Sequence, residues 1–385
     1  MFGHIQPGPP DPMFTLKKNA DNDNSPEKVD LGVGIYRSEA GKYQELKYES
    51  TIGDAEFLSL AAGVMFGEGS IALKSGRISS VQTISGTGAN SLGALLISKT
   101  MQPKPKVFIG VPTWGNHVPI FKDAGLETTT YPYLDSSKHA VDFAGILEVV
   151  KSAPKGSVFV LQGCCHNPTG VDFSVQQWQE LAMEMKAHGH LPFFDTAYQG
   201  LGDGLDEDSA GVRVFVASGI ELFVCQSFSK NFALYGERCG VLHVVANTEE
   251  VAANVQDKLR SFIRHTYSSS PAYGSRLVKI ALSNNDMRGD WIAELDNMRQ
   301  RLKANRQALY HQLTDILKTP GDWSHLTKEK GLFSCLALSP SQCKSLVNTY
   351  HVHLPESGRI NVAGLSENNV ERAAKAFDKV IREQG

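Results

Sequence analysis

The stretch SFSKNFALYGERCG, residues 227–240, places a single lysine directly after an apolar run. The run, Leu222–Cys225, is typical of a buried strand. Lys230 follows among aromatic and aliphatic residues, where poor hydration disfavours the ammonium form, so its pKa should fall and its amine should become nucleophilic. Ser227 and Ser229 precede this lysine, and Ser227 with Arg238 can hold an anion such as a phosphate. A lysine in an exposed loop is the alternative interpretation.

The chain around this stretch has the composition of a soluble globular protein. Of its 385 residues, 41% are hydrophobic and 21% are charged, which is enough to bury a large core in two domains. The net charge of -3 gives no basic face, so nucleic acid is not expected as a partner. No apolar run is long enough to span a membrane. The first residues resemble no signal or transit peptide, and a cytoplasmic location is therefore expected.

The six cysteines show no CxxC spacing, so neither a disulfide framework nor a metal site is predicted.

Strands and helices alternate from Val81 onward. This order predicts an α/β fold with a doubly wound, mostly parallel sheet. The expected strands are 81–85, 106–110, 157–163, 191–194, 222–226 and 240–245, and the expected helices are 90–101, 142–152 and 174–188. A helical stretch over 290–317 leads to a smaller α+β unit, with a strand in 332–338 and helices near 343–350 and 367–383.

The expected domain organisation has three parts. Residues 1–47 are expected to form an N-terminal arm and part of the small domain, 48–298 a large domain that contains the lysine stretch and its candidate anion site, and 299–385 a small C-terminal domain. The first residues, to about Val29, are rich in Pro, Asn and Asp and indicate an irregular arm.

A second candidate anion site is the segment SGTGA, residues 85–89, which follows one expected strand and opens a helix. Small residues let the backbone approach an anion, and a helix N-terminus supplies free N–H groups. A tight strand–helix turn is an equally simple interpretation of this segment alone. A dinucleotide loop is less suitable, because the third glycine of that fingerprint is missing.

Asp195 lies at the carboxyl end of a predicted buried strand, where open α/β sheets bind ligands. A buried carboxylate needs a cationic or hydrogen-bonding partner, and a protonated pyridine nitrogen can be that partner. A helix N-cap is the alternative for Asp195, and a simple turn is the alternative for Asn167 in the segment NPTG. Asn167 and Tyr198 can both reach a phenolic oxygen. An amine, an anion site and a carboxylate together match pyridoxal phosphate.

Two arginines are candidates for substrate binding. Arg359 lies in SGRIN, residues 357–361, and Arg264 in FIRHTYS, residues 262–268. A guanidinium binds a carboxylate through two parallel hydrogen bonds, so two of them in one site would select a dicarboxylate. Either one can also be an ordinary surface arginine.

These motifs together resemble the aspartate aminotransferases, which are fold-type I, class I enzymes that depend on pyridoxal phosphate. The resemblance covers nearly the whole chain. It runs through FGHI at 2–5, PPDP at 9–12, LGVGIYR at 31–37, SGTG at 85–88, PTWGNH at 112–117, HNPTG at 166–170, FFDTAYQG at 193–200, the lysine stretch, GLFS at 331–334 and SGRIN at 357–361.

The resemblance implies a role for each matching residue around the cofactor. Lys230 would form the internal aldimine and shuttle the proton of the substrate. Asp195 would hold the pyridine nitrogen, with His117 behind it, Trp114 stacked on the ring, and Asn167 and Tyr198 at the phenolic oxygen. The phosphate would be held by Ser85, Gly86, Thr87, Ser227, Ser229 and Arg238.

For the substrate, the resemblance implies that Arg359 binds the α-carboxylate, aided by Gly34, Trp114 and Asn167. Arg264 and Tyr48 would reach in from a neighbouring subunit, to the distal carboxylate and to the phosphate. This implies a homodimer with composite active sites, and an enzyme that transfers the amino group of L-aspartate to 2-oxoglutarate in a ping-pong cycle.

Two departures from the family pattern bear on this expectation. Between Arg37 and Tyr48 the chain lacks about 20 residues, more than a loop adjustment, and Gln162 stands where the family often has His. Two other functions remain open: an aromatic or broad-range aminotransferase, and a paralogue whose catalysis is weakened by the shortened segment.

Overall fold

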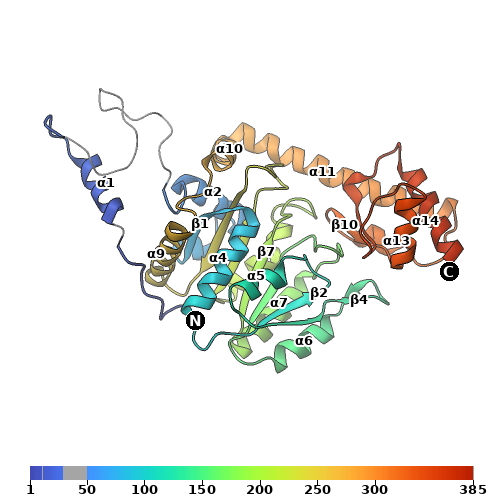
Figure 1. The fold of residues 1–385 in the computed structure, drawn as a ribbon, viewed down its shortest axis with the longest axis horizontal. Coiled ribbons are helices and arrows are strands. Elements are labelled where there is room, and N and C mark those ends of the chain that lie inside the picture. Colours follow the sequence, from blue (N-terminus) through green and yellow to red (C-terminus); the bar gives the residue numbers. More distant parts are fainter. Residues whose placement is uncertain (11, 29–49, 385) are drawn as a thin grey trace.

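The computed structural model describes residues 1–10, 12–28 and 50–384 of the chain. The predictions for Gly34, for Tyr48 and for the shortened segment between Arg37 and Tyr48 lie outside these described residues. Within them, a large sheet with helices on both faces occupies the middle of the chain, and the long helix α11, Asn285–His311, leads from it to a separate C-terminal unit (Figure 1).

The large sheet has seven strands in the order β1-β9-β8-β7-β6-β2-β3. The strands β2, β3, β6, β7 and β8 run parallel to one another, whereas β9 is antiparallel to both β8 and β1. This confirms the predicted mostly parallel sheet. Their bounds are β1 Ile78–Ile84, β2 Val107–Val111, β3 Thr128–Pro132, β6 Val158–Gln162, β7 Leu191–Thr196, β8 Leu222–Ser227 and β9 Cys239–Val245.

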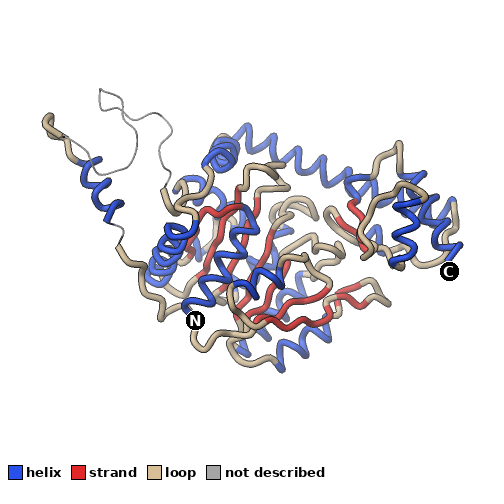
Figure 2. Tube along the Cα trace, in the orientation of Figure 1, coloured by secondary structure: helices blue, strands red, loops and turns tan. Residues whose placement is uncertain are grey.

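Each face of this sheet has its own hydrophobic core, because successive side chains of a strand point to opposite faces. Phe193 of β7 belongs to the core under α4, α5 and α9, and the next residue, Phe194, belongs to the core under α2, α6, α7 and α8. The helices are α2 Ala55–Phe66, α4 Ser85–Thr100, α5 His117–Asp123, α6 Phe143–Ser152, α7 Val175–His188, α8 Ala210–Ala217 and α9 Glu249–Thr266. Figure 2 shows the strands between these two helical layers.

Capping residues set the limits of several helices. Ser174 and Gln177 form a reciprocal capping box at the start of α7, and Gly189 ends this helix in the left-handed conformation that glycine tolerates best. Thr248 accepts a hydrogen bond from the N–H of Val251 at the start of α9.

The C-terminal unit has a core separate from the two sheet cores, built from buried side chains between Leu302 and Val380. Helix α11, Asn285–His311, continues into a π-helical turn, Gln312–Ile316, and contributes to this core. Strands β10 Phe333–Cys335 and β11 Arg359–Asn361 pair antiparallel, beside α12 His325–Lys328, α13 Pro340–Asn348 and α14 Val370–Gln384. The smaller α+β unit was thus correctly predicted, while the boundaries at 47/48 and 298/299 remain predictions.

Short elements complete the described chain: α1 Pro12–Asn22, α3 Ile71–Lys74, the hairpin of β4 Leu134–Asp135 and β5 Ala140–Val141, and α10 Ala272–Ser283. The expectation of an irregular N-terminal arm was wrong in one part, because α1 is a helix. Proline is compatible with the first position of a helix, where its missing N–H has no partner to lose, and Pro12 stands at that position. Phe2 and Ile5, at the start of the arm, are buried in the core of the chain's own sheet.

Candidate active site

The functional residues predicted from five separate motifs meet at one edge of the large sheet. The carboxyl ends of the parallel strands β6, β7 and β8 lie there, together with that of β1. Because β9 is antiparallel, its amino end lies at the same edge, which brings Arg238 beside Ser85 and Ser227. An open cavity at this edge is lined by the predicted residues Ser85, Gly86, Thr87, Trp114, Asn167, Asp195, Tyr198, Ser227, Ser229, Lys230 and Arg238.

One end of the cavity is built to bind an anion. Helix α4 begins at Ser85, so its first N–H groups lack intrahelical partners. Arg238 donates a hydrogen bond from Nη2 to the hydroxyl of Ser85, and Ser227 donates to Ser229 across 3.1 Å between their Oγ atoms. A Cβ at Gly86 would come within 3.0 Å of the Cβ of Ser227, so glycine keeps the backbone close to these hydroxyls.

Lys230 lies just beyond β8, in the turn that follows Ser227. Its Nζ is 5.0 Å from the centroid of the Tyr198 ring. Burial lowers the pKa of the Lys230 amine below its ordinary value of 10.5, and the Arg238 cation lowers it further, whereas the Asp195 carboxylate opposes this shift. A lysine with a lowered pKa is more often in the nucleophilic, uncharged form, as the sequence predicted.

Asp195 is the last-but-one residue of β7 and is 8% exposed. Its Oδ2 lies 3.0 Å from Nε2 of His117, and Nδ1 of the same imidazole lies 2.7 Å from Oγ1 of Thr113. Oδ1 of Asp195 is buried and has no hydrogen-bond partner among the described residues. The contact with His117 therefore fixes Oδ2, and Oδ1 can accept a hydrogen bond from an N–H or O–H group of a ligand in the cavity.

Asn167 connects the cavity to the C-terminal unit. Its Oδ1 accepts a hydrogen bond from Nη1 of Arg359 at 3.1 Å, and its Nδ2 donates to the hydroxyl of Tyr198 at 3.5 Å. The Arg359 guanidinium lies over the ring of Phe333, 4.5 Å from the centroid. Strand β11 thus brings Arg359 to the cavity, although more than a hundred residues separate it from the lysine stretch.

Trp114 lines the cavity next to His117, with the two ring centroids 5.3 Å apart and the planes nearly perpendicular. Arg264 does not line the cavity of its own chain. It lies in the last turn of α9, donates a hydrogen bond to the hydroxyl of Ser268 at 2.8 Å, and lines a separate hollow with Pro9 and Pro10.

Four residues at the site were not predicted to belong to it: Gln162, which was noted only as a departure from the family pattern, Ala197 and Tyr235, which line the cavity with it, and Phe333 under Arg359. Gln162 ends β6, and its amide group accepts from the N–H of Asn167 at 2.8 Å and donates to the carbonyl of Asn167 at 2.9 Å. Its position at a strand end, like that of Asp195, was the signal that could have identified it.

The arrangement fits pyridoxal phosphate. This cofactor needs an amine for its aldehyde, donors for its phosphate and an acceptor for its protonated pyridine nitrogen. Lys230 supplies the amine, the start of α4 with Ser227 and Arg238 supplies the donors, and the unpartnered Oδ1 of Asp195 supplies the acceptor.

Comparisons with known proteins agree with this geometry. Residues 26–377 match the family described as aminotransferase class I and II. Aminotransferase tasG of Hapsidospora irregularis is 43% identical over 382 residues, which cover 99% of this chain and 96% of that protein. Aspartate aminotransferase 1 of Medicago sativa is 40% identical over 400 residues, covering 99% and 95% of the two chains.

Solved structures show the same fold over the whole chain. The aspartate aminotransferase from the cytoplasm of Saccharomyces cerevisiae aligns with a TM-score of 0.85 and 37% identity, covering 100% of this chain and 99% of that one. The aromatic-amino-acid aminotransferase of Burkholderia pseudomallei, covalently bound to pyridoxal phosphate, aligns with a TM-score of 0.86 and 35% identity over 99% of each chain. This chain belongs to the aminotransferase class I and II family, and it is an enzyme that uses pyridoxal phosphate to transfer amino groups.

Proposed function

We propose that the protein transfers the amino group of L-aspartate to 2-oxoglutarate, giving oxaloacetate and L-glutamate. The observation that carries this proposal is the single cavity in which Lys230, Asp195 and the anion-binding residues meet, with Arg359 beside it. Full-length relatives named aspartate aminotransferase, from Medicago sativa and from the cytoplasm of rice, support the choice of substrate.

The residues that hold the cofactor in this proposal are those that line the cavity. Ser85, Gly86, Thr87, Ser227, Ser229 and Arg238 would bind the phosphate. Asp195, held by His117, would bind the pyridine nitrogen, and Asn167 and Tyr198 the phenolic oxygen. When bound, pyridoxal phosphate supplies an electron sink for the bonds at the substrate's α-carbon.

Substrate binding and proton transfer are assigned to four residues. Arg359 would bind the α-carboxylate through its guanidinium fork, while Asn167 fixes the orientation of that fork. Lys230 has a lowered pKa, so its uncharged amine can accept the proton of the substrate's α-carbon, and it would deliver this proton to the aldehyde carbon of the cofactor. Trp114, which lines the cavity, would stack on the ring of the cofactor.

The distal carboxylate of aspartate is assigned to the neighbouring subunit of a homodimer. Arg264 lies away from the cavity of its own chain, which is consistent with a role in the cavity of a partner. Tyr48 would reach the partner's phosphate site and Gly34 would close over the substrate, both as expected from the sequence. A cytoplasmic location belongs to the same proposal and is supported by cytoplasmic relatives. Among the described residues, no helix is both long and apolar enough to cross a membrane.

An assay with competing amino donors tests the proposal. The purified protein, loaded with pyridoxal phosphate, is given 2-oxoglutarate with L-aspartate or L-phenylalanine, and glutamate formation is followed. A higher kcat/KM for aspartate supports the proposal. A higher kcat/KM for phenylalanine favours the aromatic or broad-range alternative, which the likeness to the Burkholderia pseudomallei aromatic-amino-acid enzyme supports. No turnover of either donor favours the weakened paralogue.

A further inference from the structure

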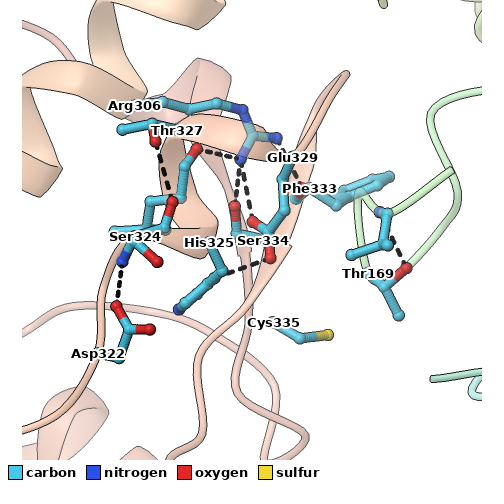
Figure 3. A network of polar contacts seen from close by, with 12 residues as sticks. Thr169, Arg306, Asp322, Ser324, His325, Thr327, Glu329, Phe333, Ser334 and Cys335 are labelled. Atoms are coloured by element: carbon cyan, nitrogen blue, oxygen red, sulfur yellow. Dashed lines mark hydrogen bonds and ion pairs between the residues drawn. The ribbon is translucent and has the colours of Figure 1, made fainter. Parts of the chain in front are cut away.

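A buried polar network lies in the C-terminal unit, next to the residues that hold Arg359. Its centre is the guanidinium of Arg306, on helix α11, which is 2% exposed. Arg306 is paired with the buried carboxylate of Glu329 at 3.2 Å, and Glu329 in turn lies 2.9 Å from Nδ1 of His325. Figure 3 shows the Arg306 guanidinium joined by hydrogen bonds to both Glu329 and Ser334.

Arg306 also binds the main chain of one short segment. Its Nη2 donates to the carbonyl oxygens of Lys330, Gly331 and Phe333 at 3.3, 3.0 and 2.7 Å. Its Nη1 donates to the hydroxyl of Ser334, which is fully buried. These acceptors belong to the turn before β10 and to β10 itself, so one side chain fixes the path of residues 330–334.

The segment fixed in this way, together with the next residue, Cys335, contacts Arg359 at two points. The ring of Phe333 lies under the guanidinium, and Cys335 of β10 is the strand partner of Arg359 in β11. The guanidinium of Arg359 is thus held in two ways, by the ring of Phe333 below it and by the hydrogen bond from Nη1 to Asn167. Together these two contacts fix the orientation of its remaining N–H donors.

The same segment also contacts the loop that carries Asn167, the other partner of Arg359. The N–H of Lys330 donates to the carbonyl of Gly170 at 2.7 Å, and Sγ of Cys335 lies 3.4 Å from the carbonyl of Pro168. At Gly170, whose φ is +71°, a Cβ would lie 2.4 Å from the carbonyl oxygen of Phe333, so the two segments are in direct contact.

We propose that Arg306 is a positioning residue for substrate binding: by fixing residues 330–334 it places Phe333, and through Phe333 the guanidinium of Arg359. This inference rests on the proposed role of Arg359 as the group that binds the α-carboxylate. The planar guanidinium of Arg306 has five N–H donors, and these can reach hydrogen-bond acceptors that are spread over residues 330–334. A lysine at this position would offer three N–H donors from a single nitrogen and could not reach all of these acceptors. The charge of lysine still balances Glu329.

The test compares Arg306→Lys with a matched control, Arg301→Lys. Arg301 lies on the same helix and also donates to main-chain carbonyls of the C-terminal unit, those of Ala363 and Leu365, but it makes no contact with residues 330–334 that the described structure shows. For both variants, KM and kcat are measured with L-aspartate and with L-phenylalanine, relative to the concentration of sites loaded with pyridoxal phosphate.

Arg306→Lys should raise KM for both amino acids by the same factor, about 10- to 100-fold, because small displacements of a binding group have effects of that size. The affinity of the apoenzyme for pyridoxal phosphate should stay within about twofold of wild type, since Arg306 does not line the cavity. Amide hydrogen exchange in residues 330–336 should increase in Arg306→Lys and not in Arg301→Lys.

The route through Phe333 is tested by a double-mutant cycle. In a Phe333→Leu background, Arg306→Lys should change KM by only about twofold, because the two substitutions interrupt the same path. If Arg306→Lys changes KM by the same factor in the wild-type and the Phe333→Leu backgrounds, the proposal is overturned. It is also overturned by a KM for Arg306→Lys that matches Arg301→Lys, or by a loss of cofactor affinity as large as the loss of kcat/KM.

If Arg306→Lys does not accumulate as folded protein, Ser334→Ala takes its place, because it removes one acceptor of Arg306 and leaves both buried charges. It should raise both KM values in the same ratio, and unchanged values overturn the proposal. Measuring KM with both L-aspartate and L-phenylalanine also separates this inference from the proposal that aspartate is the substrate. Both amino acids have an α-carboxylate, so a displaced Arg359 should affect the two KM values equally. If the wild-type enzyme preferred phenylalanine, aspartate would be refuted as the substrate, but the ratio of the variant KM to the wild-type KM should still be the same for both amino acids.

Discussion

Nε2 of His117 lies 3.0 Å from Oδ2 of Asp195, and this contact fixes one oxygen of a carboxylate whose other oxygen has no partner among the described residues. Thr113, 2.7 Å from Nδ1 of the same ring, fixes the orientation of the imidazole. The carboxylate is thus oriented before any ligand enters the cavity. Preorganised polar groups of this kind are effective because they need not rearrange when the ligand binds.

Asp195→Asn should therefore lower kcat/KM sharply. The amide keeps the shape of the side chain but loses the charge that pairs with a protonated pyridine nitrogen. Removing one partner of a buried charged pair costs about 2–5 kcal/mol, or roughly 30- to 4,000-fold in kcat/KM. Asp206→Asn is the control, because this exposed carboxylate pairs with Arg213 at the surface. Similar kinetics for the two variants would contradict the role of Asp195.

Lys230→Ala should lower kcat by about 100- to 10,000-fold or more, the range for loss of a positioned proton-transfer group. Pyridoxal phosphate should still bind, because the residues assigned to the phosphate are unchanged, but as the free aldehyde. Absorbance spectra and kcat together check this expectation. Lys230→Arg keeps the positive charge and should be equally inactive; an active Lys230→Arg variant would show that charge rather than the amine matters.

The pKa of Lys230 should respond in opposite directions to its two charged neighbours. Removing the Asp195 carboxylate as Asp195→Asn should lower this pKa further, and removing the Arg238 cation as Arg238→Gln should raise it. The pKa of Lys230 is measured as the midpoint of the pH dependence of the rate at which the apoenzyme reacts with pyridoxal phosphate. In the wild-type enzyme this pKa should lie below 10.5. If the pKa of Lys230 shifted in the same direction in both variants, the opposite effects assigned to Asp195 and Arg238 would be contradicted.

The same shift has a consequence for stability. Between its folded-state pKa and the unfolded value of 10.5, Lys230 binds more protons in the unfolded chain than in the folded apoenzyme. Its contribution to the free energy of unfolding therefore increases as the pH rises through this window. Lys230→Met removes this contribution, so the difference in stability between wild type and Lys230→Met should change with pH in that window and stay constant below it.

Much of the site could be predicted because its residues stand at the ends of parallel strands. Asp195 and Ser227 follow apolar runs, and the carboxyl ends of such strands share one edge of the sheet. Arg238 is different: it reaches this edge only because β9 is antiparallel, which the pattern of apolar residues does not reveal. Its assignment came from its nearness to the lysine in sequence and from the family resemblance.

Other parts could not be predicted for definite physical reasons. The contact between Arg359 and Phe333 depends on the pairing of β10 with β11, two strands of three residues each, which carry little periodic signal. Helix α9 is different, because its buried residues Ala252, Val255, Leu259 and Ile263 recur at helical spacing, so the signal for this helix was present in the sequence and was overlooked. Arg264 lies at the end of this helix, and its place relative to a partner chain follows from no feature of a single chain.

Arg264→Asp should lower kcat/KM for L-aspartate far more than for a neutral amino acid, because a carboxylate would then face the distal carboxylate of the substrate. Mixing Arg264→Asp with Lys230→Ala subunits adds a test of the dimer. In random heterodimers one site has both an intact Lys230 and an intact Arg264, so about a quarter of the wild-type activity should return in an equimolar mixture. No recovery after subunit exchange would contradict a composite site.

The central claim, that this cavity carries out both halves of a transamination between aspartate and 2-oxoglutarate, is tested most directly by absorbance. The protein is loaded with pyridoxal phosphate and its visible spectrum is recorded, first alone, then with L-aspartate, then after 2-oxoglutarate. The visible band should disappear with aspartate and return with the oxo acid. A band that forms but stays unchanged on addition of aspartate would contradict this account.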